Sequence, residues 1–276
     1  MNPLHRPDKA AAEASELAAF AHFVRRRTGL VFDDYRSLHA FSTQDIDRFW
    51  ALFIEWSGPL ATGNRDRVRV GSGVQESRFF PDVQLSWAEN LLADRGDGEE
   101  GAVALVAVDE SGARAEITRA SLRQRVRSVA AGLAELGVRE GDRVAAVVRN
   151  AIDTVVACLA VTSLGASWSS LAPDMGLQTA LGRLRLLEPR ILLIHARSRH
   201  NGATRTLAVR DLVNALPSLV AVVRLDDGDE VGDAVHTERR IDGEKKRAGS
   251  KLRDRCKILA HIERRRRRID NLVGQR

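Results

Sequence analysis

The chain has 276 residues, of which 44% are hydrophobic, 29% charged and 5% aromatic. This composition is typical of a globular protein with one large domain or two small ones. The longest apolar run, near residues 155–161, is far shorter than the roughly 20 residues that span a bilayer, and the N-terminus lacks the apolar core of a signal peptide. Two distant cysteines, Cys158 and Cys256, favour neither a disulfide framework nor a zinc site. We therefore expect a cytoplasmic protein that does not bind membranes.

The net charge of +6 is distributed unevenly along the chain. Residues 236–276 contain 15 Lys and Arg against 6 Asp and Glu, whereas residues 1–235 contain 28 against 31. All Phe and Tyr residues precede position 81, and Trp168 is the last aromatic residue. A segment with this much charge and no rings buries too little apolar surface to offset its chain entropy. We expect residues 228–276 to be disordered or loosely helical, and not a domain.

Residues 1–100 are predicted to form a helical N-terminal extension, because their apolar residues recur at helical spacing. A helix is expected to begin at Ser42, with Asp45 completing a capping box, and to end at Gly58. Residues 59–78 are rich in Gly and Arg and are predicted to form a loop. The helices expected in this part span residues 13–27, 42–57 and 87–93.

Residues 101–227 contain short apolar runs that alternate with longer helical stretches. This alternation predicts βαβ crossovers and a mostly parallel sheet with helices on both faces. The predicted fold class is α/β, with a helical N-terminal extension. The helix that begins near residue 152 is expected to be capped by Asn150 and Asp153. The expected strands span residues 102–108, 113–117, 143–148, 166–170, 191–195 and 219–225, and the expected helices span residues 121–136, 152–164 and 177–187.

Several common motifs for phosphate, metal and nucleophile chemistry are absent from the sequence. There is no GxxxxGK[ST] loop, no GxGxxG after a predicted strand, no HExxH, no GxSxG and no CxxC pair. Cys158 lies within an apolar helix and is interpreted as a buried, inert thiol. His195 and His200 have no sequence neighbour that could orient a base or share a metal, so we interpret both as structural or solvated. We predict no catalytic residue and no metal ligand in this chain.

Four stretches of the sequence resemble one enzyme family. In chain order they are FFPDVQLSWAENLL (79–92), GVREGDRV (137–144), SLGASWSSLAPDMG (163–176) and LLEPRILL (186–193). Over residues 41–225 the chain resembles the N-terminal part of the adenylate-forming acyl-CoA synthetases. The first and third stretches resemble the acetoacetate-specific branch of that family in particular. The resemblance implies that residues 101–227 are a partial AMP-binding domain, part of the large N-terminal domain of such an enzyme.

The resemblance also implies a reaction. Family members use Mg-ATP to convert the acid, here acetoacetate, to an acyl-adenylate, and then transfer the acyl group to CoA. They supply a Ser/Thr/Gly-rich loop ending in Lys, a Tyr-Gly-x-Thr-Glu segment, a hinge Asp and a late Lys, and none of these is present here. We therefore expect no ATP or Mg site in this chain and no activity from the chain alone. The alternative is a fragment of an acetyl- or other short-chain acyl-CoA synthetase.

One ligand-binding segment of the family falls within this chain. After the strand that ends in ILLI, family members carry a basic, Gly-containing loop that reaches the phosphates of CoA, and it aligns here with Arg197, Arg199, Asn201 and Gly202. The position after that Gly is usually basic in the family, but here it is Ala203. Arg can bind phosphate through two nitrogens and Asn-Gly allows a close backbone approach, although the same residues also suit an ordinary solvated loop.

Three further hypotheses concern the end of the chain. After Leu225 the sequence departs from the family pattern, so the chain could be a truncated product whose final residues are out of frame. It could also be a non-catalytic fragment that pairs with a separate C-terminal piece. The five consecutive arginines at 264–268 could bind anions or nucleic acid through counterion release. Because no aromatic residue or recognition motif accompanies them, we expect no specific nucleic-acid partner.

Overall fold

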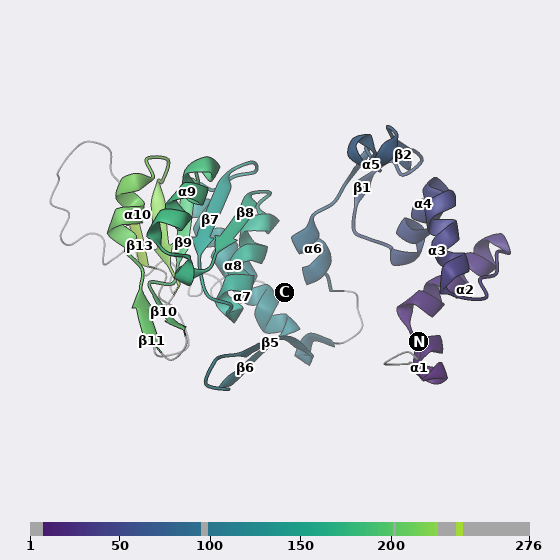
Figure 1. Cartoon of the computed structure of the whole chain (residues 1–276), viewed down its shortest axis with the longest axis horizontal. Helices are drawn as coiled ribbons and strands as arrows, with labels where there is room; N and C mark the ends of the chain where they lie inside the picture. The colour runs from purple at the N-terminus through teal and green to yellow at the C-terminus, as the bar shows by residue number, and fades with distance from the viewer. Residues whose placement is uncertain (1–7, 95–98, 201–202, 226–235, 240–276) are drawn as a thin grey trace, which may run out of the picture. The chain divides into compact units, whose positions relative to one another are not determined.

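The computed structural model describes residues 8–94, 99–200, 203–225 and 236–239. They form two compact units that divide along the chain between Ser86 and Trp87. The first unit is mainly helical, and the second is an α/β unit (Figure 1). No helix in the described ranges is long and apolar enough to cross a membrane.

The first unit begins with four helices whose ends are set by local capping. Ser15 accepts a hydrogen bond from a backbone amide in the first turn of the second helix, and Asp34 with Ser37 forms a capping box at the third. Gly29 and Gly58 end the second and fourth helices in the left-handed conformation. The four helices are α1 (Lys9–Glu13), α2 (Glu16–Thr28), α3 (Tyr35–Gln44) and α4 (Ile46–Ser57).

The predicted capping box at Ser42 and Asp45 is wrong, although the predicted end at Gly58 is confirmed. Ser42 lies inside α3, where its hydroxyl donates to the carbonyl of His39. Asp45 precedes α4 but makes no side-chain capping bond. A serine followed three residues later by an acidic residue occurs both at helix starts and within helices. The predicted start at Ser42 is therefore several residues too early.

The core of the first unit is built around Phe20. It is 3% exposed, and its ring centroid lies 5.6 Å from those of Phe49 and Phe53 and 5.2 Å from that of Trp56. Aromatic contacts at these separations stabilise a core beyond the area that they bury. The rings of α4 therefore pack against α2 in a shared core.

Residues 62–84, which overlap the loop predicted at residues 59–78 and extend beyond it, contain four two-residue strands. They form two small antiparallel pairs, β1 with β4 and β2 with β3. Pairs this short leave no apolar periodicity in the sequence, which explains why they were not predicted. The elements are β1 (Thr62–Gly63), β2 (Arg69–Val70), a short helix α5 (Gly73–Glu76), β3 (Arg78–Phe79) and β4 (Val83–Gln84).

The second unit contains a five-stranded sheet in the order β13-β12-β9-β7-β8. The strands β12, β9, β7 and β8 run parallel, and β13 is antiparallel at one edge. The sheet strands are β7 (Arg143–Val147), β8 (Ser167–Leu171), β9 (Ile191–Ile194), β12 (Ala221–Arg224) and β13 (His236–Arg239). The helices are α6 (Trp87–Leu92), α7 (Arg119–Glu135), α8 (Ile152–Ser163), α9 (Leu177–Leu187) and α10 (Val209–Ala215), with 3-10 turns η1 (Glu99–Gly101) and η2 (Pro173–Met175).

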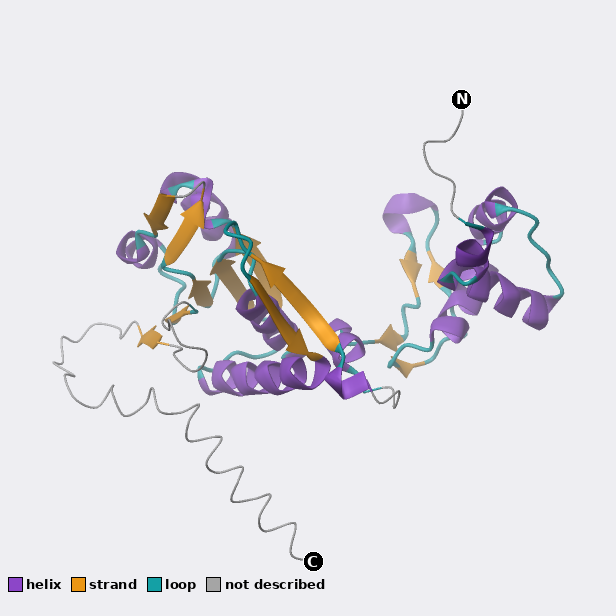
Figure 2. Ribbon diagram, turned by 90° about the horizontal axis from the view of Figure 1, so that it is seen from below, coloured by secondary structure: helices purple, strands orange, loops and turns teal. Residues whose placement is uncertain are grey.

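Helices cover both faces of this sheet (Figures 1 and 2). Val144, Ala146 and Leu193 point into a core shared with α7 and α8. Their sequence neighbours Ala145 and Leu192 point into a second core shared with α9 and α10. Strands buried on both sides read as continuous apolar runs, so the predicted parallel α/β sheet is confirmed.

Four details of the second unit differ from expectation. The strands β5 (Val103–Val108) and β6 (Arg114–Thr118) form a separate antiparallel hairpin, closed by a turn in which Asp109 accepts from Ser111 and Ala113. The predicted CoA loop contains a second hairpin, β10 (Arg197–His200) with β11 (Ala203–Thr206). The N-cap of α8 is Ala151, and neither Asn150 nor Asp153 caps it.

The fourth difference is β13, which lies within the segment expected to be disordered or loosely helical. Four of its residues, His236–Arg239, pair with β12. The charge that marked this segment as unfolded does not prevent an edge strand, because an edge strand pairs through its backbone on one side. The remainder of the predicted tail, including the arginines at 264–268, lies outside the described residues.

Candidate functional site

The carboxyl edge of the parallel sheet is the candidate site. Strand β7 has β8 on one side and β9 on the other, and the chain forms β8 before it crosses to β9. The loops that leave β7 and β9 therefore diverge toward opposite faces of the sheet. In open α/β sheets, such switch points at the carboxyl ends of the strands are where ligands bind.

Three segments gather at this edge. The loop after β7 carries the exposed Arg149, and η2 follows β8. The β10–β11 hairpin follows β9 and lies beside η2. Its base is closed by a hydrogen bond from the amide of Leu207 to the carbonyl of Ala196, at 2.9 Å. The SWSSLAPDMG stretch and the predicted CoA segment, distant in sequence, are thus neighbours in the fold.

The predicted CoA-binding residues belong to the hairpin. Arg197 is exposed and begins β10, opposite Thr206 of β11. Arg199 lies two residues further along the same strand. Asn201 and Gly202 join the two strands and lie outside the described residues. Where a solvated loop was predicted, the backbone of β10 and β11 is an antiparallel ladder, which restrains the two arginine positions more than a loop would.

His195 is the functional candidate that the sequence did not reveal. Its side chain is completely buried between the ends of β7 and β9. Its Nε2 lies 2.9 Å from Oδ2 of Asp153, and its Nδ1 accepts a hydrogen bond from the backbone amide of Arg149 at 3.1 Å. The interpretation of His195 as structural fits these contacts, but its partners lie more than 40 residues earlier in the chain. The sequence feature that could have indicated this pair is a histidine directly after β9 and an aspartate in the first turn of α8, the helix that follows the neighbouring strand β7.

The contact with His195 lowers the pKa of Asp153. Burial raises the pKa of Asp153, but the hydrogen bond and electrostatic interaction with His195, followed by the positive charge of Arg149, more than offset burial, so this pKa lies below its ordinary value. The carboxylate is therefore ionised at neutral pH and acts only as an acceptor. The pair joins the first turn of α8 to the end of β9.

Cys158 lies on α8 and is half-buried. Burial raises the pKa of its thiol above the ordinary value, so the reactive thiolate is disfavoured at neutral pH. The raised pKa agrees with the prediction of an inert thiol, but Cys158 is half-buried and not buried as predicted.

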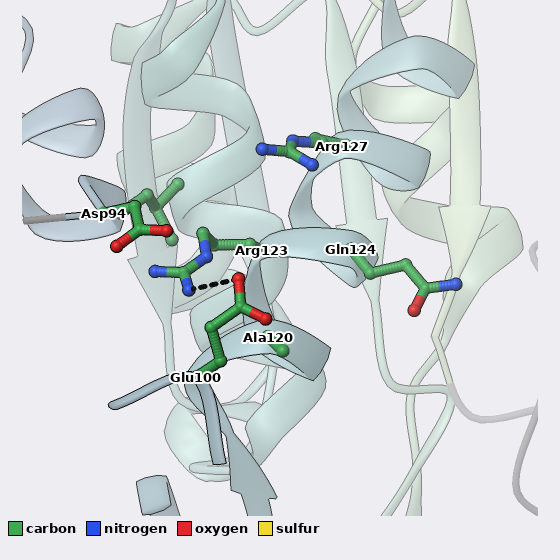
Figure 3. Close-up of a pocket in the computed structure, with 7 residues that line it drawn as sticks. Asp94, Glu100, Ala120, Arg123, Gln124 and Arg127 are labelled. Atoms are coloured by element: carbon green, nitrogen blue, oxygen red, sulfur yellow. Dashed lines mark hydrogen bonds and ion pairs between the residues drawn. The ribbon is translucent and has the colours of Figure 1, made fainter. Parts of the chain in front are cut away.

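A second candidate is a cavity of about 350 Å³ beside α7, at a distance along the chain from the switch-point loops. In Figure 3, Arg123 extends from α7 toward Glu100, and the two side chains form an ion pair at 3.4 Å. Asp94 and Arg127 also line the cavity, so its lining carries two acids and two bases. Such a balanced lining does not favour a phosphate ligand, and we regard the carboxyl edge as the stronger candidate.

Within the described ranges there is no group of three or more His, Cys, Asp or Glu side chains that could hold a metal ion. Residues 92–259 match the family model described as AMP-binding enzyme. The match covers more than half of the chain and includes the sheet and its carboxyl edge. The chain belongs to the AMP-binding enzyme family.

Individual relatives agree with this assignment. The chain is 33% identical over 219 residues to the malonamoyl-CoA synthetase of Penicillium aethiopicum, covering 77% of this chain and 30% of that protein. It is 31% identical over 223 residues to the acetoacetyl-coenzyme A synthetase of Rhizobium meliloti (strain 1021), covering 80% of this chain and 34% of that protein. The chain therefore spans about a third of the length of these relatives.

The fold gives the same result. The chain superimposes on the acetoacetyl-CoA synthetase from Streptomyces lividans with a TM-score of 0.74 and 32% sequence identity, over 83% of this chain and 36% of that one. The resemblance predicted from the four sequence stretches is confirmed at the level of the adenylate-forming acyl-CoA synthetases and their α/β fold.

Proposed function

We propose that this chain is the N-terminal part of an ATP-dependent acid–CoA ligase that forms an acyl-adenylate and then the CoA thioester. The observation that carries the proposal is the AMP-binding match over residues 92–259, together with a parallel sheet whose switch point is the usual ligand-binding edge of such folds. The proposal extends to acetoacetate as the acid, supported by the names of the relatives from Rhizobium meliloti and Streptomyces lividans.

The malonamoyl-CoA synthetase of Penicillium aethiopicum supports a definition of the acid by its chemical class. Acetoacetate and malonamate are both short acids with a second carbonyl at position 3, and they differ only in a terminal methyl or amino group of similar size. We therefore define the substrate class as short acids with a carbonyl at position 3. An acetyl- or other short-chain acyl-CoA synthetase remains the alternative.

In this proposal the chain's own contribution is to CoA binding. Arg197 and Arg199 on the β10–β11 hairpin bind a CoA phosphate, and Asn201 with Gly202 allows its backbone to approach. Ala203 removes one positive charge that the family usually places there. No described residue is assigned to ATP or Mg, so adenylate formation requires groups beyond those in this chain, and we propose that the chain is inactive alone.

Titration calorimetry of the purified chain with CoA and with dephospho-CoA, which lacks the 3′-phosphate, tests this role. We expect CoA to bind more tightly than dephospho-CoA, and Arg197→Ala with Arg199→Ala to remove the difference. Ala203→Lys should strengthen CoA binding by roughly threefold to tenfold, because it restores a charge beside the phosphate.

The matched control is Arg185→Ala, since Arg185 is an exposed arginine in the last turn of α9. It should leave both affinities unchanged. Equal affinity for CoA and dephospho-CoA in the unmodified chain would remove the support for a phosphate site at the hairpin.

A further inference from the structure

His195 connects the two sides of the switch point through its two ring nitrogens. We propose that His195 is a positioning residue: as a neutral imidazole with its proton on Nε2, it holds the end of β9 against the loop after β7 and so fixes the base of the β10–β11 hairpin. In its ligand-binding consequence this inference rests on the proposed CoA role of the hairpin.

The hydrogen-bond partners determine the tautomer. The backbone amide of Arg149 can only donate, so the Nδ1 atom of His195 that lies 3.1 Å from it carries no proton. Asp153 is an ionised carboxylate and can only accept, so the Nε2 atom at 2.9 Å carries the proton. A second proton on Nδ1 would face the Arg149 amide proton directly. The geometry therefore selects one neutral form of the ring.

The groups on both sides of the ring are themselves fixed. The hydroxyl of Thr154 donates to the carbonyl of Arg149 at 2.7 Å, which holds the loop against the first turn of α8. The backbone amide of His195 donates to the carbonyl of Val147 at 3.0 Å, which extends the β7–β9 ladder by one residue. His195 thus ties the loop, α8 and the sheet together at one point.

The hairpin begins immediately after this point. Ala196, which is 2% exposed, and Leu207 form its base and pack in the core beneath α9 and α10. The hairpin sequence itself, Arg-Ser-Arg-His followed by Ala-Thr-Arg-Thr, is polar. Its position is therefore set at the base, where the only residue between β9 and Ala196 is His195.

The first experiment determines the tautomer in the full-length chain. Nitrogen-15 NMR at pH 7 should show His195 with an unprotonated Nδ1 and a protonated Nε2. The chain has seven histidines, so the signals are assigned by their loss in His195→Gln. A ring protonated on Nδ1, or on both nitrogens, would overturn the proposal.

The second experiment separates positioning from general stability by hydrogen exchange. His195→Leu removes both hydrogen bonds, and we expect the Leu207 amide to exchange at least about tenfold faster, while the amides of β7 change less. His195→Asn is the conservative variant, because its side-chain oxygen can still accept from the Arg149 amide, and it should restore part of the protection. Uniformly faster exchange across the sheet, or no change at Leu207, would contradict a positioning role. If His195→Leu does not fold, His195→Asn against the unmodified chain provides the same comparison.

The third experiment tests whether the hydrogen bonds of His195 affect CoA binding. We expect His195→Leu to weaken CoA binding about tenfold and dephospho-CoA binding much less, with His195→Asn intermediate. Equal CoA affinity in all three chains would overturn the proposed effect of His195 on the hairpin. If the unmodified chain does not bind CoA, the proposed CoA role of the hairpin fails, and so does the proposed effect of His195 on CoA binding. The NMR and hydrogen-exchange results still decide whether His195 positions the base of the hairpin.

Discussion

Asp153 links the stability of the sheet in acid to the candidate site at its carboxyl edge. Its carboxylate is held ionised by the hydrogen bond with His195 and by the nearby Arg149, in spite of partial burial. A carboxyl group whose pKa is lower in the folded state contributes stability above its unfolded pKa. That stability is lost as the pH falls through the folded pKa.

The first prediction concerns this carboxylate. Between pH 7 and about pH 4 the free energy of unfolding should keep the contribution of Asp153, and below the ordinary carboxyl pKa of 3.8 that contribution should disappear. Asp153→Asn should lower the free energy of unfolding at pH 7 by less than about 1 kcal/mol, because the side chain is 37% exposed. It should also make the free energy of unfolding fall less steeply below about pH 4. Urea unfolding across this pH range measures both effects.

The control for this prediction is Glu135→Gln, which removes an exposed carboxylate near the end of α7. Its free energy of unfolding should fall with decreasing pH as steeply as that of the wild type. An Asp153→Asn chain with the same acid dependence as the wild type would show that the His195 pair does not stabilise the ionised carboxylate.

At the level of elements, α2 and α4 depend on a small aromatic core. Among residues 8–86, the aromatic cluster of the first unit has four buried members: Phe20, Val24, Leu38 and Leu52. The other rings of this cluster are half-buried around Phe20. A core of this size gives a unit little reserve against the loss of one large side chain.

The second prediction follows from that packing. Phe20→Ala should destabilise the first unit by about 3–5 kcal/mol, because it removes a ring that contacts Phe49, Phe53 and Trp56. The near-ultraviolet circular dichroism of the aromatic residues should weaken at a lower urea concentration than in the wild type. Val74→Ala is the control, since Val74 is fully exposed and its loss should be nearly neutral. A change equal to that of the control would mean that these rings do not form the core.

The third prediction concerns the β1–β4 pair. Gly63 adopts φ of +99°, and a Cβ atom there would overlap the carbonyl oxygen of Asp82 on the facing segment. Gly63→Ala should therefore cost more than about 2 kcal/mol, from a steric clash added to the cost of positive φ. Gly29→Ala is the matched control, because Gly29 also has positive φ but a Cβ would meet no atom within 4 Å. We expect it to cost about 1 kcal/mol. Equal urea midpoints for the two variants would contradict the clash.

At the scale of the whole molecule, the chain contains four parallel strands in one sheet and spans about a third of the length of its relatives. Electrostatic stabilisation of a transition state needs donors and cations placed where charge develops. The sequence contains none of the four motifs by which the family supplies these groups. Under the proposed function, the chain by itself therefore lacks the groups that would stabilise the transition state.

The fourth prediction is that the purified 276-residue chain releases no pyrophosphate from ATP with acetoacetate and forms no acetoacetyl-CoA. The positive control is the full-length relative from Rhizobium meliloti in the same assay, and the negative control is a mock purification. Turnover above the mock purification that Arg199→Ala abolishes would place catalytic chemistry on the hairpin and contradict the proposal.

Most of the second unit could be predicted from the sequence, because buried parallel strands and their crossover helices leave distinct patterns. The runs RVAAV and ILLI gave β7 and β9, and α9 was predicted with its observed bounds, Leu177–Leu187. The hairpin β10–β11 was missed because its residues are polar without alternation, and β13 because a charged edge strand resembles a disordered tail. For the candidate site, the sequence placed Arg197 after the strand that ends in ILLI, and its role in CoA binding stays a prediction. Nothing in the sequence indicated that His195 pairs with Asp153, because the two residues are 42 positions apart.

The sequence by itself therefore determined the family, the α/β class and the alternation of the parallel strands with their crossover helices, because these depend on local apolar patterns and on four short stretches that resemble the family. Only the tertiary structure decided which loops meet, because strand order in a sheet is set by packing between segments far apart in sequence. Crossing from β8 over β7 to β9 brings His195 beside Asp153 and Arg149. That crossing creates the switch point at which the hairpin is held.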